Sequence, residues 1–181
     1  GANSAAIANY TMAFGVNALA SSNNAIAIGR FANATGNVAI AFGMFANASS
    51  NDTFAAGAFA QALSDNALAI GTNATATGEN TMAIGTCSNA YLADAFAAGL
   101  QAEAIGANSM SLGFQSKARK TNSLAYGTRA NASADNAMAT GTDAKASGNE
   151  SIASGTCAQA TTQGAIAIGP LAKATAEETI A

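Results

Sequence analysis

The stretch Asn66-Ala67-Leu68-Ala69-Ile70-Gly71 decides the fold, because its pattern returns throughout the 181-residue chain. The stretch ends on a glycine, and such glycines recur at intervals of fourteen residues without a slip. A large apolar residue stands three positions before each later glycine, and an alanine stands five positions after every one. Self-similarity at a fixed period is the signature of a stacked repeat array. The glycines of this series are Gly1, Gly15, Gly29, Gly43, Gly57, Gly71, Gly85, Gly99, Gly113, Gly127, Gly141, Gly155 and Gly169.

The composition excludes several classes of protein. The formal net charge is −3 and only 9% of residues are charged, whereas a general nucleic-acid binder needs a basic footprint. Half of the chain is apolar, which is too much for a charged disordered tail. No apolar window approaches the roughly 20 residues of a membrane helix, and no segment reads as a signal peptide. The chain has no His and its carboxylates are scattered, so we expect no metal site, no cofactor and no catalytic constellation.

Each repeat predicts two short strands separated by turns. In Ala25-Ile26-Ala27-Ile28-Gly29 small and large residues alternate, which is the two-residue period of a half-buried strand. Ala32-Asn33-Ala34 predicts a second strand with one wet face, and Thr35-Gly36-Asn37 predicts the turn that follows. A helix is the alternative, because alanine has the highest helix propensity. The recurring glycines, however, leave no uninterrupted stretch of the about 12–15 residues that an isolated helix needs.

These repeats predict an all-β, single-domain parallel β-roll (a solenoid) of about 13 coils, in which equivalent residues of successive coils stack about 4.8 Å apart. We expect the large residues to lie inside, against alanines of the second strand. The alanines two positions before each glycine would then form a flat outward strip that other chains must cover. The reverse arrangement would expose a still more apolar strip, so either arrangement predicts assembly. The expected interface residues are Ala13, Ala27, Ala41, Ala55, Ala69, Ala83, Ala97, Ala125, Ala139, Ala153 and Ala167.

The repeat resembles the head motif of trimeric autotransporter adhesins, the YadA-like heads. The units that carry this resemblance include Asn24 to Gly29, Asn66 to Gly71 and Asn80 to Gly85, and the resemblance extends over essentially residues 1–181. It implies a left-handed β-roll, a homotrimer, and an adhesin that attaches bacteria to a host extracellular matrix protein such as collagen, or to a host cell receptor. It also implies a place on the bacterial cell surface, a role in virulence, and attachment to the outer membrane through segments not in this chain.

Some features of the chain depart from the family pattern. The family's stalk, neck and membrane barrel have no counterpart here, so we expect a head fragment that does not itself touch the membrane. Where isoleucine usually stands, one position before the glycine, this chain has Ala56, Ala98, Thr140 and Ser154. We expect the coils that carry these smaller residues to be less tightly filled.

Two groups of residues are candidates for ligand contact. Phe31, Phe45 and Phe59 occupy one position in three consecutive repeats and predict an aromatic ladder beside a turn. Such a ladder either anchors a partner or packs against a neighbouring chain. The basic cluster of Lys117, Arg119 and Lys120 either attracts an anionic polysaccharide or is a solvated turn.

The two cysteines stand too far apart for a bridge within one roll. Cys87 and Cys157 are five repeats apart, which is about 24 Å along a parallel roll. A disulfide needs Cα atoms about 4.4–6.8 Å apart. The two thiols are therefore either free or paired between chains.

Two other functions compete with adhesion. Ice or crystal-surface binding is suggested by a threonine series one position after the glycines, which Leu100 and Phe114 interrupt; its members are Thr72, Thr86, Thr128, Thr142 and Thr156. A carbohydrate-active enzyme needs paired carboxylates and a cleft. Asp94 and Glu103 are the only neighbouring acidic residues in mid-chain, and nothing marks a groove. We therefore expect an adhesive head that is not an enzyme.

Overall fold

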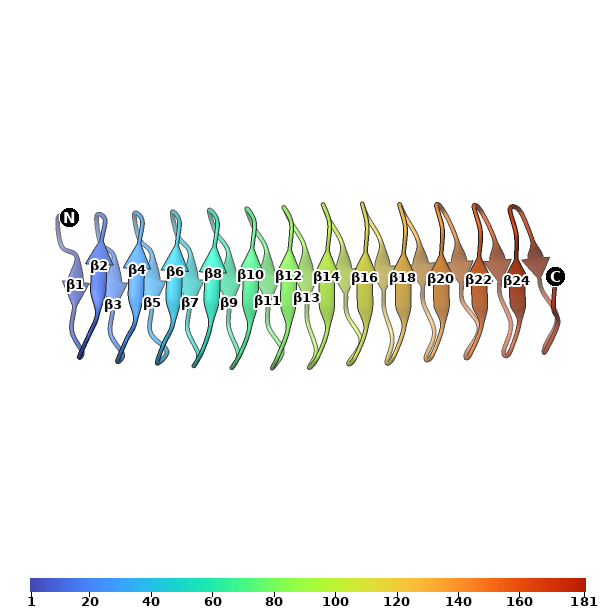
Figure 1. Ribbon diagram of the computed structural model, residues 1–181, viewed down its shortest axis with the longest axis horizontal. Coiled ribbons are helices and arrows are strands. Elements are labelled where there is room, and N and C mark those ends of the chain that lie inside the picture. Colours follow the sequence, from blue (N-terminus) through green and yellow to red (C-terminus); the bar gives the residue numbers. More distant parts are fainter. The chain divides into compact units, whose positions relative to one another are not determined.

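The computed structural model describes residues 1–181, and the chain contains strands and turns but no helix. Two compact units, Gly1–Ala90 and Tyr91–Ala181, share one architecture. In each unit three-residue strands alternate along the chain with two-residue strands, and the two kinds form separate layers (Figure 1). The prediction of an all-β parallel solenoid is confirmed. The units together contain about 12 turns, one fewer than expected, because the 25 strands form 12 two-strand coils with one strand left over.

The strands of the first unit fall into two layers. The three-residue strands are β2 (Met12–Phe14), β4 (Ile26–Ile28), β6 (Ile40–Phe42), β8 (Phe54–Ala56), β10 (Leu68–Ile70) and β12 (Met82–Ile84). The two-residue strands are β1 (Ala5–Ala6), β3 (Leu19–Ala20), β5 (Asn33–Ala34), β7 (Asn47–Ala48), β9 (Gln61–Ala62), β11 (Thr75–Ala76) and β13 (Asn89–Ala90).

The second unit repeats this arrangement. Its three-residue strands are β14 (Phe96–Ala98), β16 (Met110–Leu112), β18 (Leu124–Tyr126), β20 (Met138–Thr140), β22 (Ile152–Ser154) and β24 (Ile166–Ile168). Its two-residue strands are β15 (Glu103–Ala104), β17 (Lys117–Ala118), β19 (Asn131–Ala132), β21 (Lys145–Ala146), β23 (Gln159–Ala160) and β25 (Lys173–Ala174). With strands as its only regular elements, the chain holds no apolar helix of membrane-spanning length.

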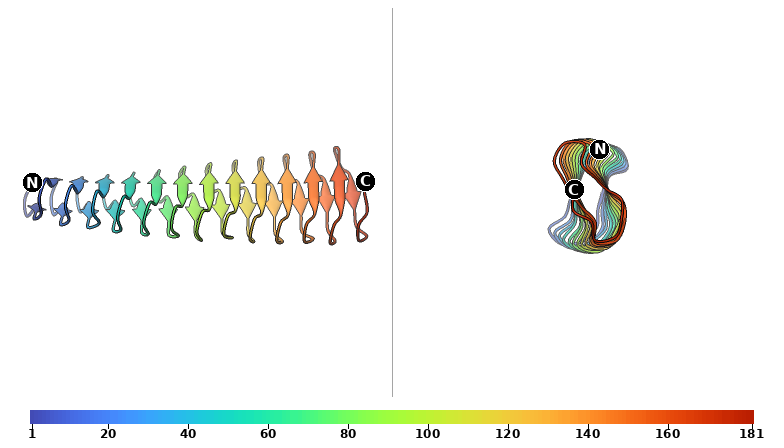
Figure 2. Two further views of the ribbon diagram at one scale, coloured as in Figure 1. Left: turned by 60° about the horizontal axis from the view of Figure 1, so that its bottom comes forward. Right: turned by 90° about the vertical axis from the view of Figure 1, so that its right-hand side faces the viewer.

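The strand pairing follows the fourteen-residue period. In the β10–β12 pair, Leu68 stands opposite Met82 and Ile70 opposite Ile84, and the strands run parallel. Within each unit every coil therefore overlies the one before it, as the end-on view in Figure 2 shows. Like residues form straight rows along both sheets.

The recurring glycine is required by the backbone of the neighbouring coil. Gly71 has a φ of 132°, a conformation that residues with a side chain rarely adopt. A Cβ atom placed there would lie 2.5 Å from the carbonyl oxygen of Gly85, one coil further on. The period of the sequence is thus a steric condition on the stacking of coils.

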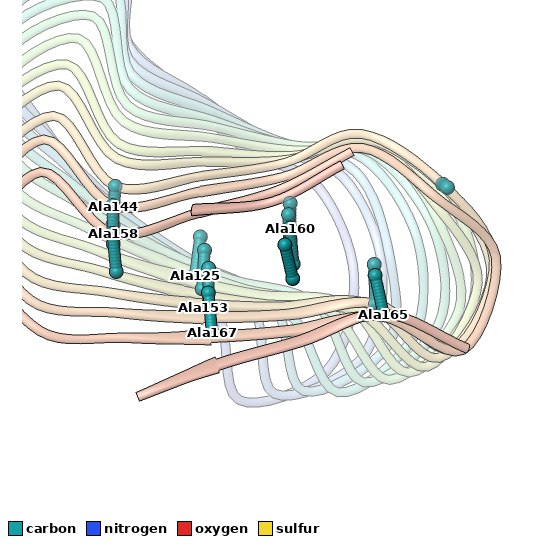
Figure 3. Close-up of a cluster of buried hydrophobic side chains, with 14 of the residues drawn as sticks. Ala125, Ala144, Ala153, Ala158, Ala160, Ala165 and Ala167 are labelled. Atoms are coloured by element: carbon teal, nitrogen blue, oxygen red, sulfur yellow. The ribbon is translucent and has the colours of Figure 1, made fainter. Parts of the chain in front are cut away.

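The interior of the coils is filled by alanine, not by the large residues, so the expected orientation of the three-residue strands is wrong. The alanine at the centre of these strands is buried within the single chain, and Figure 3 shows Ala153 and Ala167 stacked in one row beside Ala160. Methyl groups from both strands leave no room inside for Ile, Met or Phe. Ala13 is half-buried, and the fully buried members are Ala27, Ala41, Ala55, Ala69, Ala83, Ala97, Ala125, Ala139, Ala153 and Ala167.

The second strand behaves as expected. Ala32 and Ala34 are fully buried, while Asn33 between them points outward and is half-buried. The turn expected at Thr35-Gly36-Asn37 is present over residues 36–38.

Hydroxyl groups enter the interior where they can bond to the backbone of their own turn. The Thr81 Oγ1 atom donates to the Gly78 carbonyl at 2.6 Å, and the Ser151 Oγ atom donates to the Gly148 carbonyl at the same distance. A buried hydroxyl with such an acceptor avoids the penalty of an unpaired polar group. The small buried polar residues are therefore compatible with the methyl-lined core.

Candidate interaction surfaces

The outward side chains of the three-residue strands form an apolar face on each unit. Because the central alanine points inward, the residues on either side of it point outward. Many of these large side chains are well exposed in the single chain, among them Phe14 (70%), Phe42 (55%), Tyr126 (58%) and Ile168 (63%). In-register pairing places them in two rows along each unit. The row three positions before the glycines is continuous, whereas small residues (Ala56, Ala98, Thr140 and Ser154) interrupt the row one position before them. Contiguous apolar patches of this kind usually mark an interface.

The outward side chains of the two-residue strands form a polar face on the opposite side of the coil. Asn33 and Asn47 stand opposite one another on β5 and β7, and the Asn33 Nδ2 atom donates to Asn47 Oδ1 at 3.2 Å. Gln61 and Thr75 continue this row in the first unit. Side chains of this kind can remain in water, so each coil from β5 onward has one apolar face and one polar face. On β1 and β3 the corresponding residues are the apolar Ala5 and Leu19.

The predicted aromatic ladder is present in the first unit. The Phe31 and Phe45 rings lie 4.8 Å apart with an interplanar angle of 9°, and the Phe45 and Phe59 rings lie 5.1 Å apart. The guanidinium carbon of Arg30 lies 5.1 Å from the Phe31 ring centroid, within the range of a cation–π contact. The ladder therefore stacks three aromatic rings beneath a cation at the surface.

The ladder occupies a strained backbone position. Phe31, Phe45 and Phe59 have φ angles of 57°, 57° and 60°, and a bulky residue in this left-handed region is an outlier. Asn17 and Asn73 hold the equivalent turn position with similar φ angles, and asparagine tolerates them well. The positive φ therefore comes from the turn itself, because every repeat has it at this position whatever residue it carries.

The predicted basic cluster divides between two locations. Lys117 lies on β17, where its Nζ atom is 3.2 Å from Glu103 Oε2 on β15. Arg119 and Lys120 follow that strand and are exposed. Glu103, considered above as a catalytic carboxylate, is therefore an ion-pair partner, and Asp94 lies in an exposed turn.

Two lysines missed by the sequence analysis share the position of Lys117. Lys145 on β21 and Lys173 on β25 stand at the same register, and both are exposed. The sequence signal for these three lysines is their spacing of two repeats. A search for basic residues that are close in sequence does not detect it.

A second ion pair lies in the turns of the same unit. Arg129 binds the Asp143 carboxylate through two atoms, with Nε to Oδ1 at 2.7 Å and Nη2 to Oδ2 at 2.6 Å. This hydrogen bonding, together with the charge of Arg129, lowers the pKa of Asp143 below its ordinary value, and the same contact raises the pKa of Arg129.

The cysteines and carboxylates form no further site. Cys87 and Cys157 are free, half-buried thiols, and both lie at turn positions with φ near 57°. No group of three or more His, Cys, Asp or Glu side chains is placed to hold a metal ion. A shallow open hollow of about 320 Å³ is lined by Ser50, Ser64, Asp65 and Glu79. Its walls are polar turn residues, with little apolar surface to hold a ligand.

Comparison with known protein families gives one clear result. The family described as YadA head domain repeat, in two copies, matches overlapping segments along nearly the whole chain. No individual curated protein matches the chain significantly. The matched segments are residues 6–32, 20–46, 48–74, 62–86, 76–102, 104–130, 132–156 and 160–181.

Proposed function

Because the chain belongs to the YadA head domain family, we propose that it is the adhesive head of a trimeric autotransporter on a bacterial cell surface. The family is one of adhesins rather than enzymes. The observation that carries the proposal is the division of each coil into an apolar and a polar face. One face needs partners to cover it, and the other is free to meet a target. Ice binding, the alternative, is not supported by the family match.

The apolar face is proposed as the contact between three copies of the chain. Rows of Ile, Leu, Met and Phe side chains are available on it, whereas the interior alanines are not. Identical parallel rows meet well around a three-fold axis, because every coil presents the same surface at the same height. The trimer interface expected at the alanine strip thus moves to the residues beside it, including Leu68 and Ile70. The left-handed winding expected from the family resemblance stays a prediction.

The polar face and the turns are proposed as the adhesive surface. Equivalent positions recur in every coil, so a fibrous target with its own repeat would meet many weak sites at once, and avidity would result from their number. A host matrix protein such as collagen fits this description, and a host cell receptor is the other candidate. We further propose that segments outside this chain hold the head at the outer membrane, and that attachment serves virulence.

Sedimentation and solid-phase binding test the proposal together. We expect the chain to sediment as a trimer at micromolar concentration, and to bind at least one of a panel of immobilised matrix proteins. Detachment of bound chain should be slower for the trimer than for an assembly-deficient variant, because multivalency acts mainly through dissociation. A chain that remains a stable monomer contradicts the assignment of the apolar face.

The aromatic ladder is proposed as a specific contact within the adhesive surface. Phe45→Asn removes the central ring while keeping a residue that accepts a φ of 57°. We expect this variant to retain its fold and its trimer, and to bind its target more weakly. If the variant dissociates to monomers, the ladder instead packs between chains.

A further inference from the structure

The second unit carries a row of lysines on its polar face, and we propose that this row binds a linear anionic polysaccharide lying along the sheet. The row consists of Lys117 on β17, Lys145 on β21 and Lys173 on β25. We call these three residues the lysine row. The inference gives a ligand class to the adhesive head proposed above, and rests on that proposal only for its biological meaning.

The register of the sheet fixes the lysine row. Lys117 pairs with Asn131, which pairs with Lys145. Lys145 pairs with Gln159, which pairs with Lys173. A cation therefore stands at one register on every second strand, with a neutral amide between. Because parallel strands are about 4.8 Å apart, successive lysines stand about 10 Å apart along the sheet.

On the face around the lysine row, the only carboxylate carried by a strand is that of Glu103, on β15 next to Lys117. Arg119, two residues after Lys117, is exposed on the same side, because the buried Ala118 separates the two. The corresponding positions in later coils hold hydroxyls, among them Ser133, Ser147 and Thr161. Glu103 pairs with Lys117 at one end of the row, while Lys145 and Lys173 form no ion pair. The cations on this face therefore outnumber its one carboxylate, although the chain as a whole is acidic.

The other carboxylates of this unit lie off the strands. Asp143 is neutralised by Arg129, and the Asp135 Oδ1 atom accepts a hydrogen bond from the Thr121 backbone N–H at 3.0 Å. Glu150 lies in a turn, and the last acidic residues, Glu177 and Glu178, follow β25. These groups border the face without interrupting the lysine row.

The spacing of the cations selects the class of ligand. A sulfated or uronic polysaccharide repeats its charged groups with each disaccharide, a length comparable to two strands of the sheet. A DNA strand carries about one negative charge per 3.4 Å, which is also denser than the lysine row. A polysaccharide chain extended along the sheet would meet one cation per disaccharide, with the amide of Gln159, which is partly exposed, available to its hydroxyls.

The test measures binding of the full chain to heparin, with hyaluronan, dextran and single-stranded DNA as comparisons. Lys145→Gln/Lys173→Gln is expected to weaken heparin binding about tenfold at moderate salt, because fewer counterions are released and fewer sites act together. Arg30→Gln, which removes a cation from the first unit, serves as the control and should leave heparin binding within about twofold. Dextran, which is neutral, should not bind.

A charge-conserving variant tests the register itself. Lys145→Gln/Gln159→Lys keeps the composition and net charge but moves one cation to the neighbouring strand. We expect it to bind heparin about threefold to fivefold more weakly than the parent chain, since the regular spacing is lost. Both exchanged positions are on the protein surface, and circular dichroism would verify that the fold is retained.

Each result decides the inference. Heparin binding that depends on the row and on the register supports it. Equal binding by the parent chain, the double glutamine variant and the exchanged variant overturns it, as does preference for single-stranded DNA over both anionic polysaccharides. A monomeric state in sedimentation would count against the trimeric head and leave this inference standing, so the two failures are distinguishable.

Discussion

The Ser111 and Ser116 hydroxyls lie 2.7 Å apart inside one coil of the second unit, hydrogen-bonded to each other in an interior lined mainly by alanine methyl groups. The equivalent positions in the next coil are Ala125 and Ala130. The Ser116 Oγ atom also lies 3.0 Å from the Gly113 carbonyl and can donate to it, whereas Ser111 has only Ser116. The pair is therefore asymmetric, since only one of its members has a second partner.

This asymmetry predicts unequal effects of two conservative substitutions. Ser116→Ala leaves the Ser111 hydroxyl buried without a partner, and should lower the free energy of unfolding by about 1–3 kcal/mol. Ser111→Ala leaves Ser116 bonded to Gly113, and should change it by less than about 1 kcal/mol. Chemical denaturation monitored by circular dichroism would measure both.

The double variant completes a thermodynamic cycle for the same pair. Ser111→Ala/Ser116→Ala restores the alanines of neighbouring coils and should recover most of the stability lost in Ser116→Ala. Additive effects of the two substitutions would show that the hydroxyls do not interact.

The period and the strands could be predicted from the sequence, but the inward side of the strands could not. Alternation over Leu68-Ala69-Ile70 defines two faces without saying which one is inside. The choice depends on the width of the coil, which the turns and the second strand set together. A usable signal was present: alanine is almost invariant two positions before the glycine, while the neighbouring positions vary in size. A confined interior accepts side chains of one size, whereas an outer surface accepts side chains of several sizes.

A candidate surface could be predicted from the sequence where one position of the repeat holds the same kind of residue in adjacent repeats. The ladder of Phe31, Phe45 and Phe59 was predicted because one column holds the same residue in three adjacent repeats. The lysine row was not predicted, because its lysines alternate with Asn131 and Gln159 and therefore form no cluster of charge in the sequence. The ion pairs likewise depend on side-chain reach between coils, which spacing alone does not establish.

The corrected orientation makes Ala69 and Ile70 behave differently although they are adjacent. Ala69→Leu overfills the interior of the coil and should lower the stability of the fold by about 1–3 kcal/mol. The Ile70 side chain lies on the apolar face and is 37% exposed in the single chain. Ile70→Glu places a charge there, which the trimer would bury without a partner, and should therefore abolish trimer formation. Sedimentation and thermal unfolding, measured on both variants, separate the two effects.

The control for that comparison is Ala69→Ser. The interior already accommodates Ser111 at the equivalent position, so serine fits, although its hydroxyl has no serine partner in this coil. We expect a loss intermediate between the parent and Ala69→Leu. If Ala69→Leu lost the trimer but kept its thermal stability, the result would support the outward-facing alanine strip that was first expected.

Gly71, which belongs to the fourteen-residue series, and Gly164, which lies outside it, should differ sharply in their tolerance of substitution. Gly71→Ala combines a φ of 132° with a Cβ only 2.5 Å from the Gly85 carbonyl oxygen, and should cost about 3 kcal/mol or more. Gly164 has a φ of 62° and its Cβ would first meet the flexible Glu178 Cγ at 3.4 Å. Gly164→Asn should therefore change stability by no more than about 0.5 kcal/mol, because asparagine suits this φ. Equal tolerance at the two positions in thermal unfolding would contradict the stacking argument.

The ion pair of Arg129 and Asp143 predicts a pH dependence confined to acid. Since the folded state holds the pKa of Asp143 below its ordinary value, the pair stabilises the fold above the unfolded-state pKa of about 3.9, and this stabilisation is lost as the pH falls through the lower, folded-state pKa. Arg129 stays protonated throughout and contributes no pH dependence of its own. Because both side chains are exposed, the effect should be small and should weaken as salt is added.

An NMR titration of the Asp143 carboxyl measures the shift directly, and Arg129→Gln should return that pKa toward its ordinary value. An unchanged Asp143 titration in Arg129→Gln would mean that the two side chains do not pair in solution.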